Sequence, residues 1–431
     1  MKSKKIKNPL IKRIPKELAG DWKKYLVVFL FLVLTIGFVS GMYVANESML
    51  TAADEGITRY KQEDGHFELK EKADSSLIEA IESGEKADIP GQAEENTADV
   101  DNDDSEENGK SGDDLDNSKK TSVTVYENFF RNEDEDNDND GKSDGTIRVY
   151  AKTDDINLAC LLDGDFPQNE NEIAVDRMHA DNAGMKVGDK ISVSGKEFKI
   201  TGLIAYVNYS TLHEKKTDLI FDAIKFDVAM VTQEGFDRLD KSIHYSYAWK
   251  YDHAPADDIE EKEQSDSFME AMVTQVMLAG NEVEDYTPKY GNPAINFATD
   301  DMGSDKAMGG ILLDILVVII AFIFAVTISN TIANESSAIG TLRALGYTKG
   351  ELVRHYLSMP VIVTLLAAIV GNILGYTVFK NVVVSMYYNS YSLPVYKTIW
   401  NPDAFLKTTV LPVIIMLVVN LIVIVRMMQH T

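Results

Sequence analysis

Four long apolar runs that are nearly free of charge restrict the fold of this chain more than any other feature. They cover residues 25–44, 309–328, 356–379 and 405–425, and only the second contains a carboxylate, Asp314. A run of about 20 apolar residues is long enough for an α-helix to cross the hydrocarbon core of a bilayer. A spanning segment must hydrogen-bond its own peptide groups, which an α-helix does. The sequence therefore predicts a membrane protein with four transmembrane α-helices.

The basic residues around these runs predict their orientation. Residues 1–24 are rich in lysine, and residues 329–355 carry Arg343 and Arg354. Because short basic loops remain in the cytoplasm, we expect both segments and the C-terminal residues 426–431 to be cytoplasmic. The first of them is expected to contain an interfacial helix. A cleavable signal peptide is the alternative for the first run, but that run is longer than a signal core and no A-x-A-like site follows it.

The block between the first two runs, residues 45–308, is too long and too charged to span a membrane. We expect this block and the loop 380–404 to lie outside the cytoplasm. Strand-like and helix-like stretches follow one another in it, which predicts a large extracytoplasmic α+β domain inserted between helices 1 and 2. The expected strands are 60–70, 121–130, 146–152, 172–176, 190–194, 197–203, 227–232 and 246–251, and the expected helices are 74–84, 178–183, 233–240 and 257–279. Residues 89–120 are acidic and poor in apolar side chains, which predicts a disordered insertion.

Composition and motifs exclude several classes of function. The formal net charge of -26 argues against nucleic acid as a partner. The chain has one cysteine, Cys160, which cannot form an internal disulfide and is expected to be a small buried side chain. The sequence contains no P-loop, no G-x-S-x-G elbow, no H-E-x-x-H motif and no pair of histidines at metal-ligand spacing. We therefore expect neither an enzyme nor a cofactor in this chain, and any ATP hydrolysis must take place in a partner subunit.

The acidic segment 134–145 reads DEDNDNDGKSDG and matches the first half of a calcium-binding loop. The candidate ligands are Asp136, Asp138, Asp140 and Asp144. Ile147 stands where the loop would need a bidentate glutamate. A weak calcium site and a solvated acidic loop without a metal are the two interpretations.

Small residues recur four positions apart in three of the apolar runs. The pairs are Gly37 and Gly41, Ala321 and Ala325, and Gly371 and Gly375. Small residues at this spacing let helix backbones approach closely inside a membrane. The pattern predicts a packed bundle, and four helices with so few polar groups do not easily enclose an aqueous pore.

Asp314 is the one carboxylate within the apolar runs. A residue in an intramembrane relay is one interpretation, and an interfacial carboxylate close to water is the other. We expect the second, with no basic side chain from another span facing it.

The order of one span, a large outer block and three further spans resembles the permeases of ABC systems of the FtsX, MacB and LolC/LolE type. Residues 162–203 resemble the MacB-type periplasmic core domain through Pro167, Glu172-Ile173-Ala174-Val175, Ala180, Gly184, Gly188-Asp189 and Gly202. Residues 335–346 resemble the loop after the second span of FtsX-like permeases. The acidic segments 89–120 and 134–145 are departures from the family core.

This resemblance implies the permease subunit of an ABC transporter in the bacterial plasma membrane. A cytoplasmic ABC ATPase would bind ATP and Mg²⁺ and couple its closure to movement of the outer domain, for export or extraction of a lipophilic, peptide or lipoprotein cargo. The alternative is an FtsX-like mechanotransmission regulator of a cell-envelope hydrolase that transports nothing. A sensor or anchoring protein without an ATPase is a third hypothesis. Related permeases with two four-span units exist, so the expected partners include a second permease copy or a homologous half, membrane lipids and an unidentified extracytoplasmic cargo or effector.

The same resemblance implies that residues 329–355 form a coupling helix on which the ATPase docks. Ala338, Leu342 and Leu345 would supply its apolar face. For Arg343 the alternative is a topology residue that needs no partner. The full set of expected coupling residues is Glu335, Ala338, Ile339, Gly340, Leu342, Arg343, Leu345 and Gly346.

Overall fold

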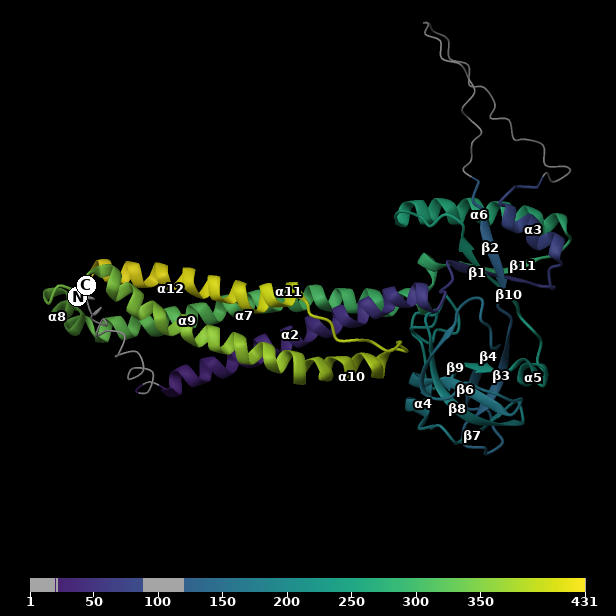
Figure 1. The fold of residues 1–431 in the computed structure, drawn as a ribbon, viewed down its shortest axis with the longest axis horizontal. Helices are drawn as coiled ribbons and strands as arrows, with labels where there is room; N and C mark the ends of the chain where they lie inside the picture. Colours follow the sequence, from purple (N-terminus) through teal and green to yellow (C-terminus); the bar gives the residue numbers. More distant parts are fainter. Residues whose placement is uncertain (1–19, 21, 88–119, 431) are drawn as a thin grey trace, which may run out of the picture. The chain divides into compact units, whose positions relative to one another are not determined.

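The computed structural model describes Gly20 and residues 22–87 and 120–430. Most of the expected interfacial helix in residues 1–24 and nearly all of the acidic insertion 89–120 lie outside the described residues. The chain divides into two units (Figure 1). The helical unit comprises Met1–Ala52, Thr299–Ser390 and Tyr396–Thr431, and the β unit comprises Ala53–Ala298 and Tyr391–Val395.

Four helices among the described residues are long and apolar enough to cross a membrane: Tyr25–Arg59, Pro293–Asn334, Lys349–Ser390 and Pro402–Met428. They agree with the four predicted spans and fit a membrane protein. Each helix extends beyond its apolar run, because adding a residue to an existing helix costs little once the first turn has formed. The third helix continues through residues 380–390, which the sequence assigned to an external loop.

These membrane helices are α2 (Trp22–Arg59) and α7 (Pro293–Asn334), followed by two composite helices. The third consists of α9 (Lys349–Leu374), a π-helical turn (Gly375–Phe379) and α10 (Lys380–Ser390). The fourth consists of α11 (Pro402–Phe405), a π-helical turn (Leu406–Val410) and α12 (Leu411–His430). The short helix α8 (Ser336–Ala344) lies between α7 and α9.

Apolar side chains from all four membrane helices form the centre of the helical unit. The central cluster contains Leu32, Val33, Ile36, Ile320, Ala321, Phe324, Val363, Ala367, Ala368 and Met416. On the outer side of α7, Ile311 and Phe322 are exposed by 63% and 59%. Such an exposed apolar surface fits contact with lipid tails rather than water.

The first part of the β unit is a four-stranded antiparallel sheet in the order β11-β1-β10-β2. Its strands are β1 (Gly65–Leu69), β2 (Val123–Glu127), β10 (Tyr245–Tyr251) and β11 (Val283–Pro288). Helices α3 (Ser75–Ser83) and α6 (Asp258–Leu278) cover one face (Figure 1) and pack around the buried rings of Phe67, Trp249 and Phe268. The expected strand 60–70 is shorter than predicted because α2 continues to Arg59 and β1 starts only at Gly65.

The second part of the β unit is a seven-stranded sheet in the order β5-β8-β6-β9-β4-β3-β7, and an additional β8–β7 pairing closes it. Six strands therefore form a ring, with β5 attached at the edge of β8. The strands are β3 (Phe130–Asp136), β4 (Gly145–Ala151), β5 (Ala159–Gly164), β6 (Glu172–Asp176), β7 (Lys190–Val193), β8 (Lys196–Tyr206) and β9 (Phe226–Val231). The sequence predicted an α+β domain but not this barrel, because closure depends on the long strand β8 pairing with three other strands.

Two short helices accompany the barrel, α4 (Arg177–Ala183) and α5 (Gln233–Asp237). The interior of the barrel is filled by branched and aromatic side chains, including Ile147, Val175, Ile191, Phe198 and Val231. Helix α5 ends at Asp237, whereas the sequence predicted a helix over residues 233–240.

The segment Tyr391–Val395, between α10 and α11, belongs to the β unit. The backbone N–H of Ser392 donates to the carbonyl oxygen of Ser210 at 2.9 Å. The Ser392 hydroxyl donates to the buried carboxylate of Asp176, and Arg177 donates to the carbonyl oxygen of Tyr391 at 2.6 Å. We call this segment the docked loop.

Candidate functional site

Helix α8 ends in a well-formed glycine cap. The N–H of Tyr347 donates to the carbonyl of Leu342 at 3.1 Å, and the N–H of Gly346 donates to that of Arg343 at 3.0 Å, which is the Schellman pattern. Gly346 has a φ of 98°, a conformation that strains any residue with a Cβ. Gly346 therefore ends α8 and turns the chain toward α9.

A capping box starts α9 two residues later. The Thr348 hydroxyl accepts a hydrogen bond from the N–H of Glu351 at 3.3 Å, and the Glu351 carboxylate accepts one from the N–H of Thr348 at 2.9 Å. A threonine followed three positions later by a glutamate is the sequence signature of this cap. The two caps fix the turn between α8 and α9.

The structure divides the predicted coupling residues into two groups. Ile339 is fully buried and packs with Ile332 of α7 and Leu352 of α9, and Leu342 is half-buried in the same cluster. Ala338, Gly340, Arg343 and Leu345 are exposed, and we call these four residues the α8 surface. Leu345 is exposed by 73%, which is high for a leucine. Ile339 thus anchors α8 to its neighbours, and the α8 surface is open to another molecule.

Glu335 immediately precedes α8 and is half-buried. Its carboxylate accepts a hydrogen bond from the hydroxyl of Tyr356 on α9 at 2.6 Å. It makes no side-chain capping hydrogen bond to α8. Glu335 therefore ties the start of α8 to α9 within the chain.

The predicted small residues on α2 and on the third membrane helix lie against each other. A Cβ added to Gly375 would lie 2.7 Å from the Cβ of Ser40 and 3.0 Å from the carbonyl oxygen of Gly37. A Cβ added to Gly371 would lie 2.8 Å from Cγ2 of Ile36, and one added to Gly41 would lie 2.7 Å from the backbone nitrogen of Lys380. At these glycines the two backbones approach too closely for any larger residue. Ala321 and Ala325 on α7 are also buried.

A polar group joins three of the membrane helices beside these glycines. The amide oxygen of Asn372 accepts hydrogen bonds from the hydroxyls of Ser40 and Thr408, both at 2.8 Å, and its Nδ2 donates to Thr409 at 3.0 Å. Interhelical hydrogen bonds of this kind stabilise helix association in membranes. The signal in the sequence was a single asparagine in an otherwise apolar run.

The expectation that no basic side chain of another span faces Asp314 is wrong. Lys407, in the fourth membrane helix, donates to the hydroxyl of Tyr43 at 2.9 Å, and the charge of Asp314 acts on the same ammonium group. Lys407 stands near the start of the run 405–425, where the apolar average of the run hides a single charge. Asp314 therefore has an opposite charge within electrostatic reach.

The acidic loop gathers three of its four predicted calcium ligands. Carboxylate oxygens of Asp136, Asp138 and Asp144 lie within 4.8 Å of one another. The carboxylate of Asp140 instead forms an ion pair with Nζ of Lys142, with Oδ2 and Nζ 3.0 Å apart. The backbone N–H groups of Asp140 and Gly141 donate to Asp136 at 3.1 and 2.9 Å, so the loop turns around that carboxylate.

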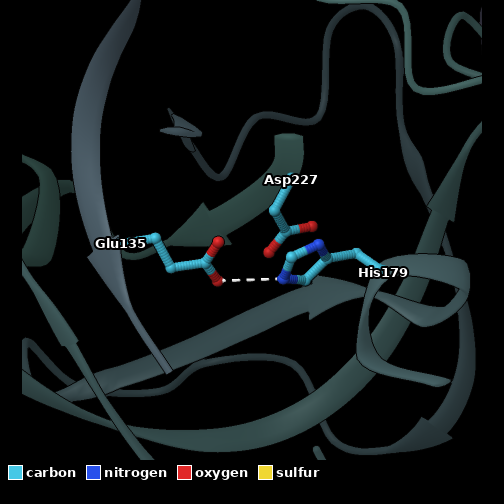
Figure 2. A group of neighbouring side chains, drawn as sticks. All are labelled: Glu135, His179 and Asp227. Atoms are coloured by element: carbon cyan, nitrogen blue, oxygen red, sulfur yellow. Dashed lines mark ion pairs between the residues drawn. The ribbon is translucent and has the colours of Figure 1, made fainter. Parts of the chain in front are cut away.

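Three buried ionisable residues that no sequence motif indicated meet inside the barrel. Glu135 comes from β3, His179 from α4 and Asp227 from β9, and Figure 2 shows their side chains converging. All three residues have an exposed fraction of 0%. His179 Nε2 lies 3.1 Å from Oε1 of Glu135, and one donor atom from each residue lies within 4.8 Å of the others. We call these residues the barrel cluster.

The electrostatics of the barrel cluster favour a positive charge at its centre. Burial by itself lowers the pKa of His179, but the negative charges of Asp227 and Glu135 outweigh this effect and raise it to about 10. Burial raises the pKa of Asp227 well above its usual range. Burying two carboxylates is costly unless a cation or a proton compensates them.

A comparison with known protein families agrees with the helical part of the structure. Residues 310–431 match the family model described as FtsX-like permease C-terminal. The matched region contains α8 and the last two membrane helices, together with most of α7. No curated protein matched the chain. Residues 310–431 are thus similar to the C-terminal part of FtsX-like permeases, which supports a permease-type membrane domain in this part of the chain.

Proposed function

We propose that this chain is the permease subunit of an ABC transporter of the FtsX/MacB type, and that a cytoplasmic ATPase docks on the α8 surface. The observation that carries the proposal is the position of α8. This nine-residue helix lies between two membrane helices and within the matched residues 310–431. Its buried side is anchored through Ile339, while its other side leaves Leu345 and Arg343 open for contact.

The contacts around α8 would transmit force into the membrane helices. Ile339 packs between α7 and α9, the Glu335–Tyr356 hydrogen bond joins the start of α8 to α9, and the Gly346 and Thr348 caps fix the turn. A helix held in this way moves together with its neighbours rather than independently. The glycine contacts then connect α9 to α2.

In this proposal the β unit lies outside the cytoplasm and corresponds to a MacB-type core domain. Residues 162–203, which carry that resemblance, form the end of β5, then β6, α4, β7 and most of β8. Both chain termini would be cytoplasmic in a bacterial plasma membrane. ATP-driven closure of the ATPase would move the β unit for export or extraction of a lipophilic, peptide or lipoprotein cargo, with a second permease copy or homologous half completing the assembly.

Substitutions on the α8 surface test the docking step. A Cβ added at Gly340 meets no heavy atom within 4 Å, so we expect Gly340→Leu to change the surface without a clash at the backbone. We expect Gly340→Leu and Arg343→Glu each to reduce co-purification of the ATPase and its stimulation by the permease by more than about tenfold, as for residues central to an interface.

Gly303→Leu is the matched control. Gly303 lies on α7, and a Cβ added there also meets no heavy atom within 4 Å. Wild-type ATPase recovery and activity in both α8 variants would refute the docking proposal. Equal losses in all three variants would assign the effect to the folding of the permease rather than to docking.

An FtsX-like regulator of a cell-envelope hydrolase is the second candidate, since the sequence resemblance implies it and the match to an FtsX-like permease model is compatible with both. The two candidates are separated by adding ATP to the full permease–ATPase complex in liposomes. ATP-dependent activation of a hydrolase without movement of lipid or peptide cargo favours the regulator. Cargo movement without a hydrolase favours the transporter.

A further inference from the structure

Four buried polar atoms of the barrel cluster face one another, and among the described residues none of them makes a well-directed hydrogen bond, although Nε2 of His179 and Oε1 of Glu135 lie 3.1 Å apart as an ion pair. They are Oε1 and Oε2 of Glu135, Nε2 of His179 and Oδ2 of Asp227. Buried polar atoms in folded proteins are almost always hydrogen-bonded, so four such atoms facing one another require an explanation. Because three of them belong to carboxylates, the compensating group carries a positive charge, which is either a proton on Nε2 of His179 or a metal ion.

Hydrogen bonds around the cluster hold these atoms in the orientation of metal ligands. His179 Nδ1 lies 2.8 Å from the carbonyl oxygen of Ala223, so in the neutral ring it donates there and leaves the lone pair of Nε2 facing the carboxylates. Oδ1 of Asp227 accepts from the N–H groups of Asp176 at 3.1 Å and Val228 at 2.7 Å, which leaves Oδ2 without a partner. Such outer hydrogen bonds fix the tautomer and direction of ligands in metal sites.

We propose that Glu135, His179 and Asp227 bind a structural zinc ion inside the barrel. Both oxygens of Glu135, Nε2 of His179 and Oδ2 of Asp227 supply four donor atoms, the number found in structural zinc sites. Zinc lies about 2.0–2.2 Å from such donors, which places atoms of different ligands roughly 3.4 Å apart. One donor atom from each of the three residues lies within 4.8 Å of the others, so metal binding would draw the three side chains closer together.

The chemistry of the donors selects the class of metal. An imidazole nitrogen suits zinc and other late first-row metals, whereas calcium and magnesium take oxygen donors. The two carboxylates balance the double positive charge of the ion. Because every ligand is fully buried, the site leaves no open position for a substrate, and the ion would join β3, β9 and α4.

Metal content measured on the full chain tests this proposal. The protein is produced in zinc-supplemented medium with a purification tag free of histidine, dialysed against metal-free buffer and analysed by mass spectrometry of the elements. We expect about one zinc ion per chain in the wild type, since such buried structural zinc is bound tightly. Dialysis should not remove it, because no ligand atom reaches solvent.

Two variants and one control locate the ion. His179→Gln and Glu135→Gln should each lose the zinc. Asp138→Asn, which alters the acidic loop instead, should retain it. Unchanged zinc in His179→Gln, or loss of zinc in Asp138→Asn alone, overturns the assignment.

If the His179 and Glu135 variants do not fold, measurements on the wild-type protein alone test the zinc site. Its zinc-edge X-ray absorption spectrum must show one imidazole nitrogen and carboxylate oxygens, and a spectrum of water ligands or several imidazoles refutes the site. A wild-type protein that contains no zinc, and whose melting temperature zinc sulfate does not raise, also refutes it. A protonated His179 would then be the compensating charge.

Discussion

Replacing Gly41 by alanine tests the close contact between α2 and the third membrane helix. The added Cβ would lie 2.6 Å from the Cβ of Phe379 and 2.7 Å from the backbone nitrogen of Lys380. Carbon atoms in contact prefer a separation of about 3.5 Å or more, so the two helices would have to move apart by roughly 1 Å. Neither obstacle is the end of a flexible side chain, so the strain cannot be relieved by a change of rotamer.

The magnitudes decide the sign of the effect. Overpacking of a well-packed interior typically costs about 1–3 kcal/mol. Alanine improves the intrinsic helix propensity over glycine by at most about 1 kcal/mol. Subtracting the full propensity gain from the overpacking cost, we expect Gly41→Ala to lower the free energy of unfolding by up to about 2 kcal/mol.

Gly303→Ala is the control, because its Cβ meets nothing within 4 Å and only the propensity gain remains. Thermal unfolding of the full chain in detergent, followed by circular dichroism, should show a lower melting temperature for Gly41→Ala and an unchanged or higher one for Gly303→Ala. Equal shifts in the same direction would show that the helices do not approach closely at Gly41, and the reasoning would fail.

Three further predictions concern local features. Gly346→Ala places a Cβ at a φ of 98° and should lower the free energy of unfolding by about 1–2 kcal/mol, whereas Gly340→Ala should not. Hydrogen exchange of the α8 amides should accelerate only in Gly346→Ala. Equal exchange rates in the two variants would contradict the cap. His66 Nδ1 lies 2.7 Å from a carboxylate oxygen of Glu63. Burial lowers the pKa of His66, but the negative charge of Glu63 raises it by more, so the net pKa lies above its usual value. The stabilisation by this pair is therefore complete below pH about 6.5 and is lost as the pH rises through the folded-state pKa, so the melting-temperature difference between wild type and His66→Gln should shrink with rising pH, and a constant difference would disprove the pairing. Calcium should raise the melting temperature of the wild type more than that of Asp138→Asn; no response, or the same response in both, would leave the acidic loop without a calcium site.

Local signals allowed the sequence to predict several elements closely. Asp74 and Gly84 cap α3 as expected, with the Asp74 carboxylate accepting from the N–H of Leu77 and Gly84 in the left-handed region. Asp257 likewise caps α6 at the predicted start. The apolar runs predicted the membrane helices for a similar reason, since spanning length is a property of consecutive residues.

Features that depend on distant pairings could not be predicted. Closure of the barrel requires β8 to pair with β7 as well as β5 and β6, and neither register nor partner is visible in an alternating pattern. The barrel cluster joins residues 135, 179 and 227, whose separations match no metal motif. At α8 the sequence placed Leu342 on the apolar docking face, but without the positions of α7 and α9 it could not show that Leu342 is half-buried beside Ile339.

The docked loop adds two covalent connections between the β unit and the membrane helices, because the chain both enters and leaves it. The chain enters the β unit through α2, leaves it through α7, and returns to it once more between α10 and α11. A body attached at one point can swivel freely, and one attached at two points can still turn about the line that joins them. Each further attachment limits how far such a turn can go. Cutting the peptide chain within Tyr391–Val395 should therefore remove this tether, while α2 and α7 continue to hold the β unit.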